Sequence, residues 1–313
     1  MSYTIIRPKN HEEWLQYRTG GIGSSEVGTI LGLNKYETPY QLWRRKIGID
    51  PPKAENNAMK AGHYLEPAVA QFFVDATGAK VIKASAGDWL MVNDDKPHMR
   101  VSPDRLYWAD GDKHSAANKR ILECKTTRMK VDEENIPYTW ICQLTYQLGV
   151  AELERGALAW LTQGQDFGYK DIYFDKEFFA YITEEVERFW VDNILGKQEP
   201  AAINAEDILL KSPLHTEGKE IIADLDTLNR LSLVKKLKEE IEELEASRND
   251  VINDLKLTIG DAESLVDSNG TLITWKAPKP TNKFDEKRFK QEHPDLYEQY
   301  QTKVQGARRF LIK

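Results

Sequence analysis

The stretch Ile121–Arg128, ILECKTTR, places a glutamate and a lysine on either side of a cysteine, behind two apolar residues. Side chains alternate across a β-strand, so Glu123 and Lys125 would leave one face of the strand and Cys124 the other. On a solvated face such a pair contributes little to stability. In a hydrolytic site, the carboxylate would bind a metal ion and the lysine would lie beside the reacting water. The pair alone does not decide between these two explanations.

A second carboxylate precedes this stretch. Asp104, in RVSPDRLYW, lies nineteen positions before Glu123 and directly follows Pro103, whose ring restricts the local backbone. Two strands joined by a loop of this length can pair and bring the two carboxylates together. A divalent cation would relieve their repulsion, and ligands that are all oxygen suit Mg²⁺ or Mn²⁺ rather than Zn²⁺. Lys125 would then lie beside the metal-bound water.

Two flanking helices carry further candidates. Glu66, in GHYLEP, lies on the helix expected before the sheet and could supply another carboxylate, although such a residue is more often a surface group. Gln143 and Tyr146, in ICQLTYQ, are three positions apart on the helix expected after the strand. They would share a face that can look toward the same site. Gln143 could equally satisfy a backbone group.

A candidate anion site lies near the N-terminus. Arg18 precedes the glycine-bracketed run GGIGSSE, in which Ser24 is a plausible N-cap of the next helix. Ser24, Ser25 and the free amides at a helix start could hold a phosphate together with the guanidinium. The alternative is that Arg18 and Ser24 only close one helix and cap the next.

The order of elements predicts an α/β fold with a mixed central sheet flanked by helices. Helical patterns occupy most of the first 78 residues, and five short β-type runs follow, rich in β-branched and aromatic residues. An exposed loop is expected at Ala109–Lys119. A helix, two strands and a helix from about Lys176 to Leu195 then complete the pattern.

The C-terminal part differs in composition. We predict a domain at 1–200 and an accessory region at 201–313, with a helical segment at 221–258 and a β-hairpin with a basic tail at 262–313. The helical segment places apolar residues at the a and d positions of about three heptads, which suits a helical hairpin or a short coiled coil. One a position is interrupted by Arg248.

Charge and cysteine content restrict the function classes. The net charge is −7, but the last 38 residues hold ten Lys or Arg and five Asp or Glu, a local charge of +5. A nucleic-acid-binding surface can exist on such a chain. Two cysteines without a CxxC motif predict no disulfide framework and no thiolate metal cluster, and no apolar run is long enough to cross a membrane. A cytoplasmic protein is expected.

Taken together, the motifs resemble a known family. RTGGIGSSEVGTILG, GHYLEP, SPDRL, ECKTT and WICQLTYQLGV are similar, in this order, to the phage lambda exonuclease or YqaJ-type viral recombinase branch of the PD-(D/E)xK nucleases. The resemblance covers about residues 10–195. It implies a restriction-endonuclease-like core and a phage- or prophage-encoded protein in a bacterial host.

The resemblance also implies roles for individual residues. Asp104, Glu123 and the backbone carbonyl of Cys124 would bind Mg²⁺, with Mn²⁺ as a substitute, and Glu66 would serve a second ion or position water. Lys125 would lie at the attacking water. The remaining roles are orientation of the lysine or the scissile phosphate by Gln143, support by Tyr146, and binding of a DNA 5′-phosphate by Arg18, Ser24 and Ser25.

The implied activity is magnesium-dependent digestion of one strand of linear duplex DNA from 5′ to 3′. A ring-shaped homo-oligomer, with a trimer favoured, would pass the remaining 3′ strand to a single-strand annealing protein. Two alternatives stay open. One is a structure- or sequence-specific PD-(D/E)xK endonuclease, and the other is a non-catalytic DNA-end-binding recombination adaptor.

Overall fold

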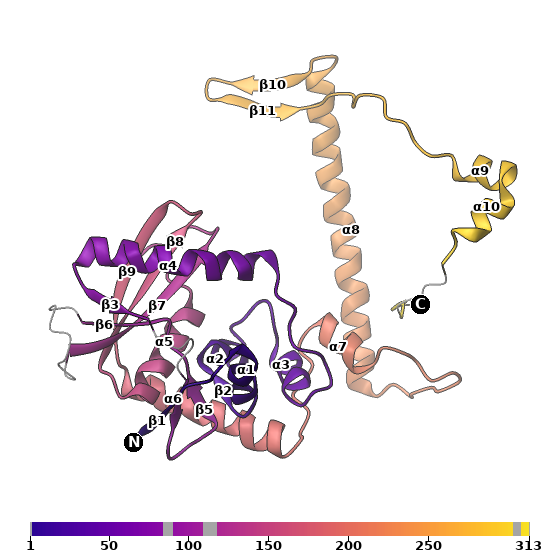
Figure 1. Ribbon diagram of the computed structural model, residues 1–313. Helices are drawn as coiled ribbons and strands as arrows, with labels where there is room; N and C mark the ends of the chain where they lie inside the picture. Colours follow the sequence, from indigo (N-terminus) through magenta and orange to yellow (C-terminus); the bar gives the residue numbers. More distant parts are fainter. Residues whose placement is uncertain (1, 84–89, 109–117, 303–307, 313) are drawn as a thin grey trace. The chain divides into compact units, whose positions relative to one another are not determined.

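The ECK motif lies on β7 (Lys119–Thr127), the middle strand of a five-stranded sheet with the order β3-β6-β7-β8-β9 (Figure 1). The computed structural model describes residues 2–83, 90–108, 118–302 and 308–312. β7 and β8 pair in parallel, and the other neighbours are antiparallel. The predicted mixed sheet is therefore confirmed. Its other strands are β3 (Lys80–Ile82), β6 (Arg105–Trp108), β8 (Arg155–Thr162) and β9 (Asp166–Tyr173).

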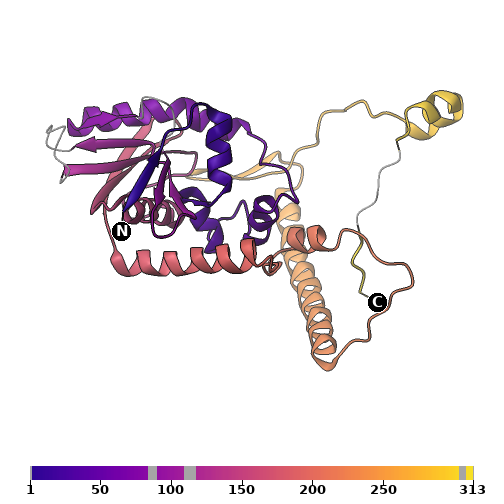
Figure 2. The ribbon, with the colours of Figure 1, turned by 60° about the horizontal axis from the view of Figure 1, so that its bottom comes forward.

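Helices cover both faces of this sheet (Figures 1 and 2). On one face, α4 (Asn57–Thr77) packs Val69 and Phe73 against Leu122 of β7. On the other face, α5 (Tyr138–Ala151) packs its leucines against Ile121. The alternation of β7 thus divides the core into two layers.

Local signals set the ends of α4. Asn56 caps the start by accepting a hydrogen bond from the Met59 amide at 2.9 Å. Gly78 ends the helix at φ +67°, a left-handed conformation in which glycine avoids steric strain. Glu66 is thereby fixed in the middle of a helix that lies along the sheet.

A second, four-stranded sheet has the order β1-β4-β5-β2. The sequence predicted the β-type runs at 88–93 and 98–102 as part of one block with the main sheet, and it predicted no strand near the N-terminus. Both expectations are wrong, because β5 pairs in parallel with the short strand at Ile22–Gly23. The sheet consists of β1 (Tyr3–Ile6), β2 (Ile22–Gly23), β4 (Leu90–Asn93) and β5 (Met99–Val101).

The N-terminal helices match the predicted positions, with one correction. They are α1 (His11–Thr19), α2 (Ser24–Ile30) and α3 (Pro39–Lys46). Ser24 is the first helical residue of α2 rather than its N-cap, which is Gly23. The carboxylate of Glu26 accepts the Gly23 amide at 2.9 Å, so the helix start is closed from inside the first turn.

Three further helical segments complete the first unit of the chain, Met1–Ser212. α6 (Lys176–Arg188) continues into a π-helical segment, η2 (Phe189–Leu195), and α7 (Ala205–Lys211) follows. A Cβ atom at Gly149 of α5 would lie 2.1 Å from the ring of Phe179, so glycine is required for the close approach of α5 and α6.

The second unit spans Pro213–Lys313. It contains α8 (Leu225–Ile259), the hairpin β10 (Ser264–Asp267) and β11 (Gly270–Thr274), and the short helices α9 (Glu286–Glu292) and α10 (Pro294–Gln299). The predicted hairpin of strands is confirmed. A helical hairpin is not formed within α8, because α8 is one continuous helix. The two short helices lie where the sequence predicted only a basic tail.

Most of the loop expected at Ala109–Lys119 lies outside the described residues. Within the described part of the chain, none of the helices has the length and apolar character needed to span a membrane.

Candidate active site on the central sheet

Asp104 and Glu123 approach each other because β6 and β7 are antiparallel neighbours. Arg105 pairs with Leu122 in the ladder, so the next step along both strands sets Asp104 opposite Glu123. The Asp104 carboxylate accepts the Cys124 amide at 2.8 Å. Asp104 lies between Pro103 and the first residue of β6. Its carboxylate therefore bonds to the backbone of the ECK motif just beyond the last paired residues of β6 and β7.

The Glu123 carboxylate is almost fully buried, at 2% exposure, and both of its oxygens are hydrogen-bonded. Lys125 Nζ donates to Oε1 at 2.8 Å and Gln143 Nε2 donates to the same oxygen at 2.5 Å. Gln147 Nε2 donates to Oε2 at 2.8 Å. Such charge-assisted bonds fix a carboxylate more firmly than neutral ones do. Glu123 is thus held in one orientation by β7 and α5 together.

Lys125 is held from two directions. Its ammonium group donates to Glu123 Oε1 at 2.8 Å and to Gln143 Oε1 at 2.7 Å. An ammonium group carries three donors, so one N–H remains for another acceptor. As predicted, the structure brings Glu123, Lys125 and Gln143 together.

The charges in this cluster perturb one another. Burial raises the pKa of Asp104 well above its usual range, and the neighbouring carboxylates of Glu123 and Glu66 add to that effect. Burial acts to lower the pKa of Lys125, but the attraction of Glu123 and Asp104 outweighs it, so the net shift is upward. Burial also raises the pKa of the Cys124 thiol, which keeps it protonated and inert as a nucleophile.

Glu66 reaches the cluster from α4 but has other partners. Arg105, buried at the start of β6, pairs with the Glu66 carboxylate and also donates to the Asp104 carbonyl at 2.7 Å. Lys83 lies 3.3 Å from the same carboxylate. Arg105 therefore links the Glu66 carboxylate to the backbone of Asp104, a contact that the sequence did not predict. Its position directly after Asp104 was the available signal.

The donor set fits a hard divalent cation, with a restriction. Asp104 and Glu123 offer carboxylate oxygens and no sulfur or imidazole, which suits Mg²⁺ or Mn²⁺. Within the described ranges, however, no three His, Cys, Asp or Glu side chains form a group that could hold a metal ion. Glu66 is engaged by Arg105 instead. Two carboxylates are therefore available as they stand, and a third requires that this ion pair open.

Tyr146 does not line the site with Gln143. It is fully buried in the core, and its hydroxyl donates to the Ile22 carbonyl at 3.3 Å. The residue that shares the face of Gln143 is Gln147, four positions along α5 rather than three. Spacings of three and four both fit a helix, so the sequence pattern alone could not choose between Tyr146 and Gln147.

Gln147 links the carboxylate cluster to the candidate anion site. The side chain is fully buried, and its Nε2 donates to Ser24 Oγ at 3.2 Å as well as to Glu123. Ser24 is accordingly buried and directed inward, whereas Ser25 is exposed. One amide group thus contacts both β7 and the start of α2.

Arg18 and Ser25 lie together at the start of α2. Arg18 Nη2 donates to Ser25 Oγ at 3.2 Å, and the guanidinium carbon lies 4.5 Å from the centre of the Trp14 ring. A Cβ atom at Gly23 would lie only 3.1 Å from Arg18 Nη2, so glycine leaves room for the guanidinium. The arrangement of a guanidinium and a hydroxyl at a helix start suits a phosphate.

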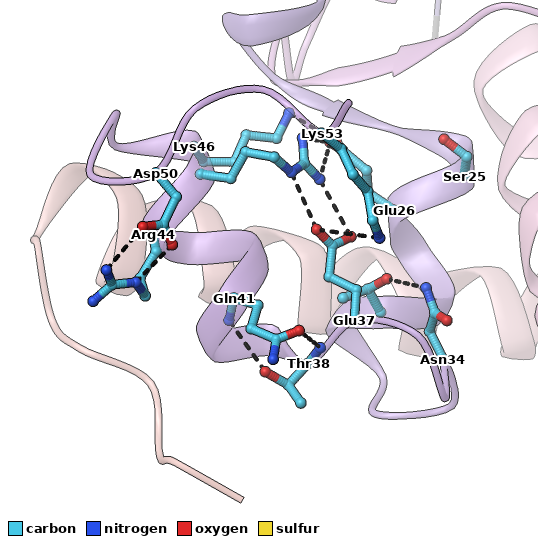
Figure 3. A network of polar contacts seen from close by, with 12 residues as sticks. Ser25, Glu26, Asn34, Glu37, Thr38, Gln41, Arg44, Lys46, Asp50 and Lys53 are labelled. Atoms are coloured by element: carbon cyan, nitrogen blue, oxygen red, sulfur yellow. Dashed lines mark hydrogen bonds and ion pairs between the residues drawn. The ribbon is translucent and has the colours of Figure 1, made fainter. Parts of the chain in front are cut away.

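A buried ion pair supports this helix start. Lys46 of α3 lies 2.8 Å from Glu26 (Figure 3). It also donates to the Gly21 carbonyl at 2.6 Å. Burial opposes the charged form of Glu26, but Lys46, Arg18 and the Gly23 amide outweigh it and lower its pKa. Burial lowers the pKa of Lys46 against the attraction of Glu26, and the nearby cations Arg45 and Arg18 lower it further.

Comparison with known proteins gives a consistent set of matches. Residues 13–154 match the model of the YqaJ-like viral recombinase domain. The protein YqaJ of Bacillus subtilis (strain 168) is 34% identical over 316 residues, which cover 97% of this chain and 94% of that protein.

Solved structures with lower similarity include two exonucleases. The alkaline exonuclease LHK-Exo of Laribacter hongkongensis is 19% identical, covers 64% of this chain and 96% of its own, and has a TM-score of 0.46. A phage-related exonuclease from Haemophilus somnus 129PT is 10% identical, with coverages of 56% and 96% and a TM-score of 0.40.

Proposed function

The chain belongs to the YqaJ-like viral recombinase family, and we propose that it is a metal-dependent nuclease that digests one strand of duplex DNA from its end. The observation that carries this proposal is the buried Glu123 carboxylate, which is held by Lys125, Gln143 and Gln147 beside Asp104. A purely structural strand has no need of two adjacent carboxylates, one of them buried and the other partly buried, and an oriented ammonium group. A hydrolytic site needs all of them.

Asp104 and Glu123 would hold Mg²⁺, or Mn²⁺ in its place, together with the Cys124 carbonyl. Such an ion, when bound, supplies a Lewis acid for the phosphate and lowers the pKa of a bound water. Glu66 would contribute to a second ion after release from Arg105. The chain's own residues orient these ligands through the hydrogen bonds from Gln143 and Gln147.

Lys125 would act as a positioned donor rather than as a ligand, since an ammonium group has no lone pair. Two of its N–H groups point to Glu123 Oε1 and Gln143 Oε1, at 2.8 and 2.7 Å. The third would donate to the attacking water or to a non-bridging oxygen of the scissile phosphate. A fixed cation at that place stabilises the charge that develops in the transition state.

We further propose that Arg18 and Ser25 bind the 5′-phosphate of a duplex end, which would set 5′-to-3′ polarity. Ser24 would support them from the buried side through Gln147. Family membership favours a ring-shaped homo-oligomer, with a trimer as our expectation, and a single-strand annealing protein as the partner that receives the 3′ strand.

The central experiment compares linear duplexes labelled at the 5′ or the 3′ end, with and without Mg²⁺. Covalently closed plasmid serves as the control for endonuclease activity. We expect mononucleotide release from the 5′ label only, only with metal, and an intact plasmid. Cleavage of the closed plasmid would favour an endonuclease, and binding of ends without any cleavage would favour an adaptor.

Site variants separate the roles. Asp104→Ala and Glu123→Ala should abolish cleavage and weaken Mg²⁺ binding in a calorimetric titration. Lys125→Ala should lower turnover by roughly 10²- to 10³-fold while Mg²⁺ still binds, since it removes one transition-state donor. Lys176→Ala, at an exposed position on α6, is the matched control. Turnover of Lys125→Ala close to that of the control would contradict the mechanism.

The end-recognition proposal has its own test. The wild-type protein should degrade 5′-phosphorylated duplex faster than 5′-hydroxyl duplex, because a phosphate dianion gains charge-assisted bonds at Arg18. Arg18→Ala should lose most of that preference while its rate on 5′-hydroxyl ends changes little. Equal wild-type rates on the two substrates would refute the assignment.

A further inference from the structure

α8 carries an apolar stripe that the second unit leaves in solvent. The helix runs for 35 residues, from a cap at Asp224 to Gly260. Its a and d positions are between 38% and 71% exposed where they are apolar. These positions are Val234, Leu237, Ile241, Leu244, Val251 and Leu255. A stripe with this period on a long helix is the pattern of a coiled-coil seam.

The charges beside the stripe exclude a parallel pairing in register. In a parallel pair, each g position faces the e position five residues further along the other helix. Glu240 would then face Glu245 of a second copy, twice per dimer. Leu233, at the preceding g position, would face the charged Lys238. Neither contact is favourable.

An antiparallel pairing centred between Glu242 and Glu243 is self-complementary. Residue numbers that face each other across the apolar seam then add to 485, so Ile241 faces Leu244 and Val234 faces Val251 of the other copy. All four positions are apolar, and the two-fold axis repeats each contact. The Ile241–Leu244 and Val234–Val251 layers of such a pair are thus matched aliphatic residues, whereas Leu237 faces Arg248 and Leu255 faces Arg230 of the other copy.

The e positions match in the same alignment, whereas the g positions set Leu233 opposite Asp254. In an antiparallel pair e positions face e positions, and here their numbers add to 483. Lys238 then faces Glu245, and Leu231 faces Ile252, of the second copy. Lys238 lies 3.6 Å from Glu242 of its own helix, but that ion pair is highly exposed and contributes little. The same register therefore forms an ion pair between Lys238 and Glu245 and an apolar contact between Leu231 and Ile252.

Arg248 fits this register as a specificity element. It interrupts the seam at an a position and would lie opposite Leu237 of the second copy, next to Glu240 of that copy. A polar residue at one seam position costs stability and fixes the alignment of the helices. In the antiparallel pair its guanidinium can reach a carboxylate, so the interruption is compensated.

We propose that α8 is a self-association element, which pairs with α8 of a second copy of this chain as an antiparallel two-stranded coiled coil. Each α8 is joined to its own nuclease domain. The pairing therefore places two such domains in one assembly, in addition to any ring that the domains form among themselves.

The first test measures the mass of the full-length chain by sedimentation or light scattering. Ile241→Asp with Leu244→Asp should at least halve the mass, because the four aliphatic side chains that form two contacts per dimer become charged. These side chains are exposed in the single chain, so the first unit should remain folded by circular dichroism. An unchanged mass would overturn the proposal and leave the stripe to a different partner.

Charge exchange tests the register. Lys238→Glu should weaken dimerisation by roughly tenfold, because two attractive pairs become repulsive. Adding Glu245→Lys should restore it. Lys235→Glu, which makes the same charge change at a b position away from the seam, is the control and should have no effect. Failure of the double variant to recover would exclude this alignment.

Cysteine cross-linking tests the direction. Under oxidation, Val234→Cys alone and Val251→Cys alone should give no more covalent dimer than the wild type. The chain carrying both substitutions should give the dimer in high yield, because Val234 faces Val251 in the antiparallel pair. Efficient cross-linking of either single variant would instead indicate parallel helices and overturn the proposal.

Discussion

Replacement of Glu26 by glutamine tests whether the buried ion pair beneath α2 supports the candidate phosphate site. Glu26 is 7% exposed and accepts from Lys46 at 2.8 Å and from the Gly23 amide at 2.9 Å. Glutamine can keep the bond to Gly23 but turns a neutral amide toward a buried ammonium group. Breaking one side of a buried pair costs about 3–5 kcal/mol.

The structure places the expected loss at the lower end of that range. Lys46 retains the Gly21 carbonyl as an acceptor at 2.6 Å, so its charge is not left without a partner. We expect the free energy of unfolding of Glu26→Gln to fall by about 3 kcal/mol at pH 7. Seven of the eight tryptophans precede residue 213, so fluorescence in a urea titration reports mainly on the first unit.

The pH dependence provides the sharper test. The folded state lowers the pKa of Glu26 below its ordinary value of 4.5. Its contribution is therefore fully present above pH 4.5 and is lost as the pH falls through the lowered pKa. The difference in stability between wild type and Glu26→Gln should shrink on acidification. A difference below about 1 kcal/mol at pH 7, or one that stays constant to pH 3.5, would refute the reasoning. The exposed Glu177→Gln is the control.

Two further predictions concern α5 and the end of the first unit. Gln147→Met should weaken Mg²⁺ binding by about 10- to 100-fold in calorimetry, because it removes a donor that orients the β7 carboxylate, whereas the exposed Gln71→Met should not. Truncation to residues 1–200 should be less stable to urea than truncation to residues 1–212. The reason is that Asp207 is fully buried and accepts a hydrogen bond at 2.8 Å from Thr38, the N-cap of α3. Equal stability of the two truncations would contradict the second prediction.

The features that the sequence predicted correctly depend on local periodicity. Alternation along β7 placed Glu123 and Lys125 on one face, and the 2.8 Å contact between them confirms that geometry. The helix around Gln143 follows from its apolar spacing. The proximity of Asp104 to the motif required only that two adjacent strands pair across a loop, which is the commonest arrangement.

The features that the sequence could not predict depend on distant pairing. β2 is two residues long and pairs with β5 across more than 70 residues of chain, so no local pattern announces the second sheet. The choice between Tyr146 and Gln147 depends on a rotation of α5 that its contacts with α2 and α6 fix. The sequence did not predict that Glu66 pairs with Arg105. The pattern of possible metal ligands includes carboxylates but not the buried arginine beside them.

Arg105 restricts the carboxylates that the proposed metal site can use. Arg105 pairs with Glu66 and contacts the Asp104 backbone. Its positive charge therefore lies on the side of the carboxylate cluster that faces α4. A buried arginine and a divalent cation compete for the same carboxylate. The Asp104 and Glu123 carboxylates are held instead by the Cys124 amide and the Lys125 ammonium group, and we propose that their remaining lone pairs accept one ion. Binding of a second ion then requires Arg105 to release Glu66. The released guanidinium would bind a phosphate group of the DNA. The number of bound ions should therefore rise when substrate is present. Arg105, which pairs with Glu66 in the absence of a second ion, would then contact the nucleic acid.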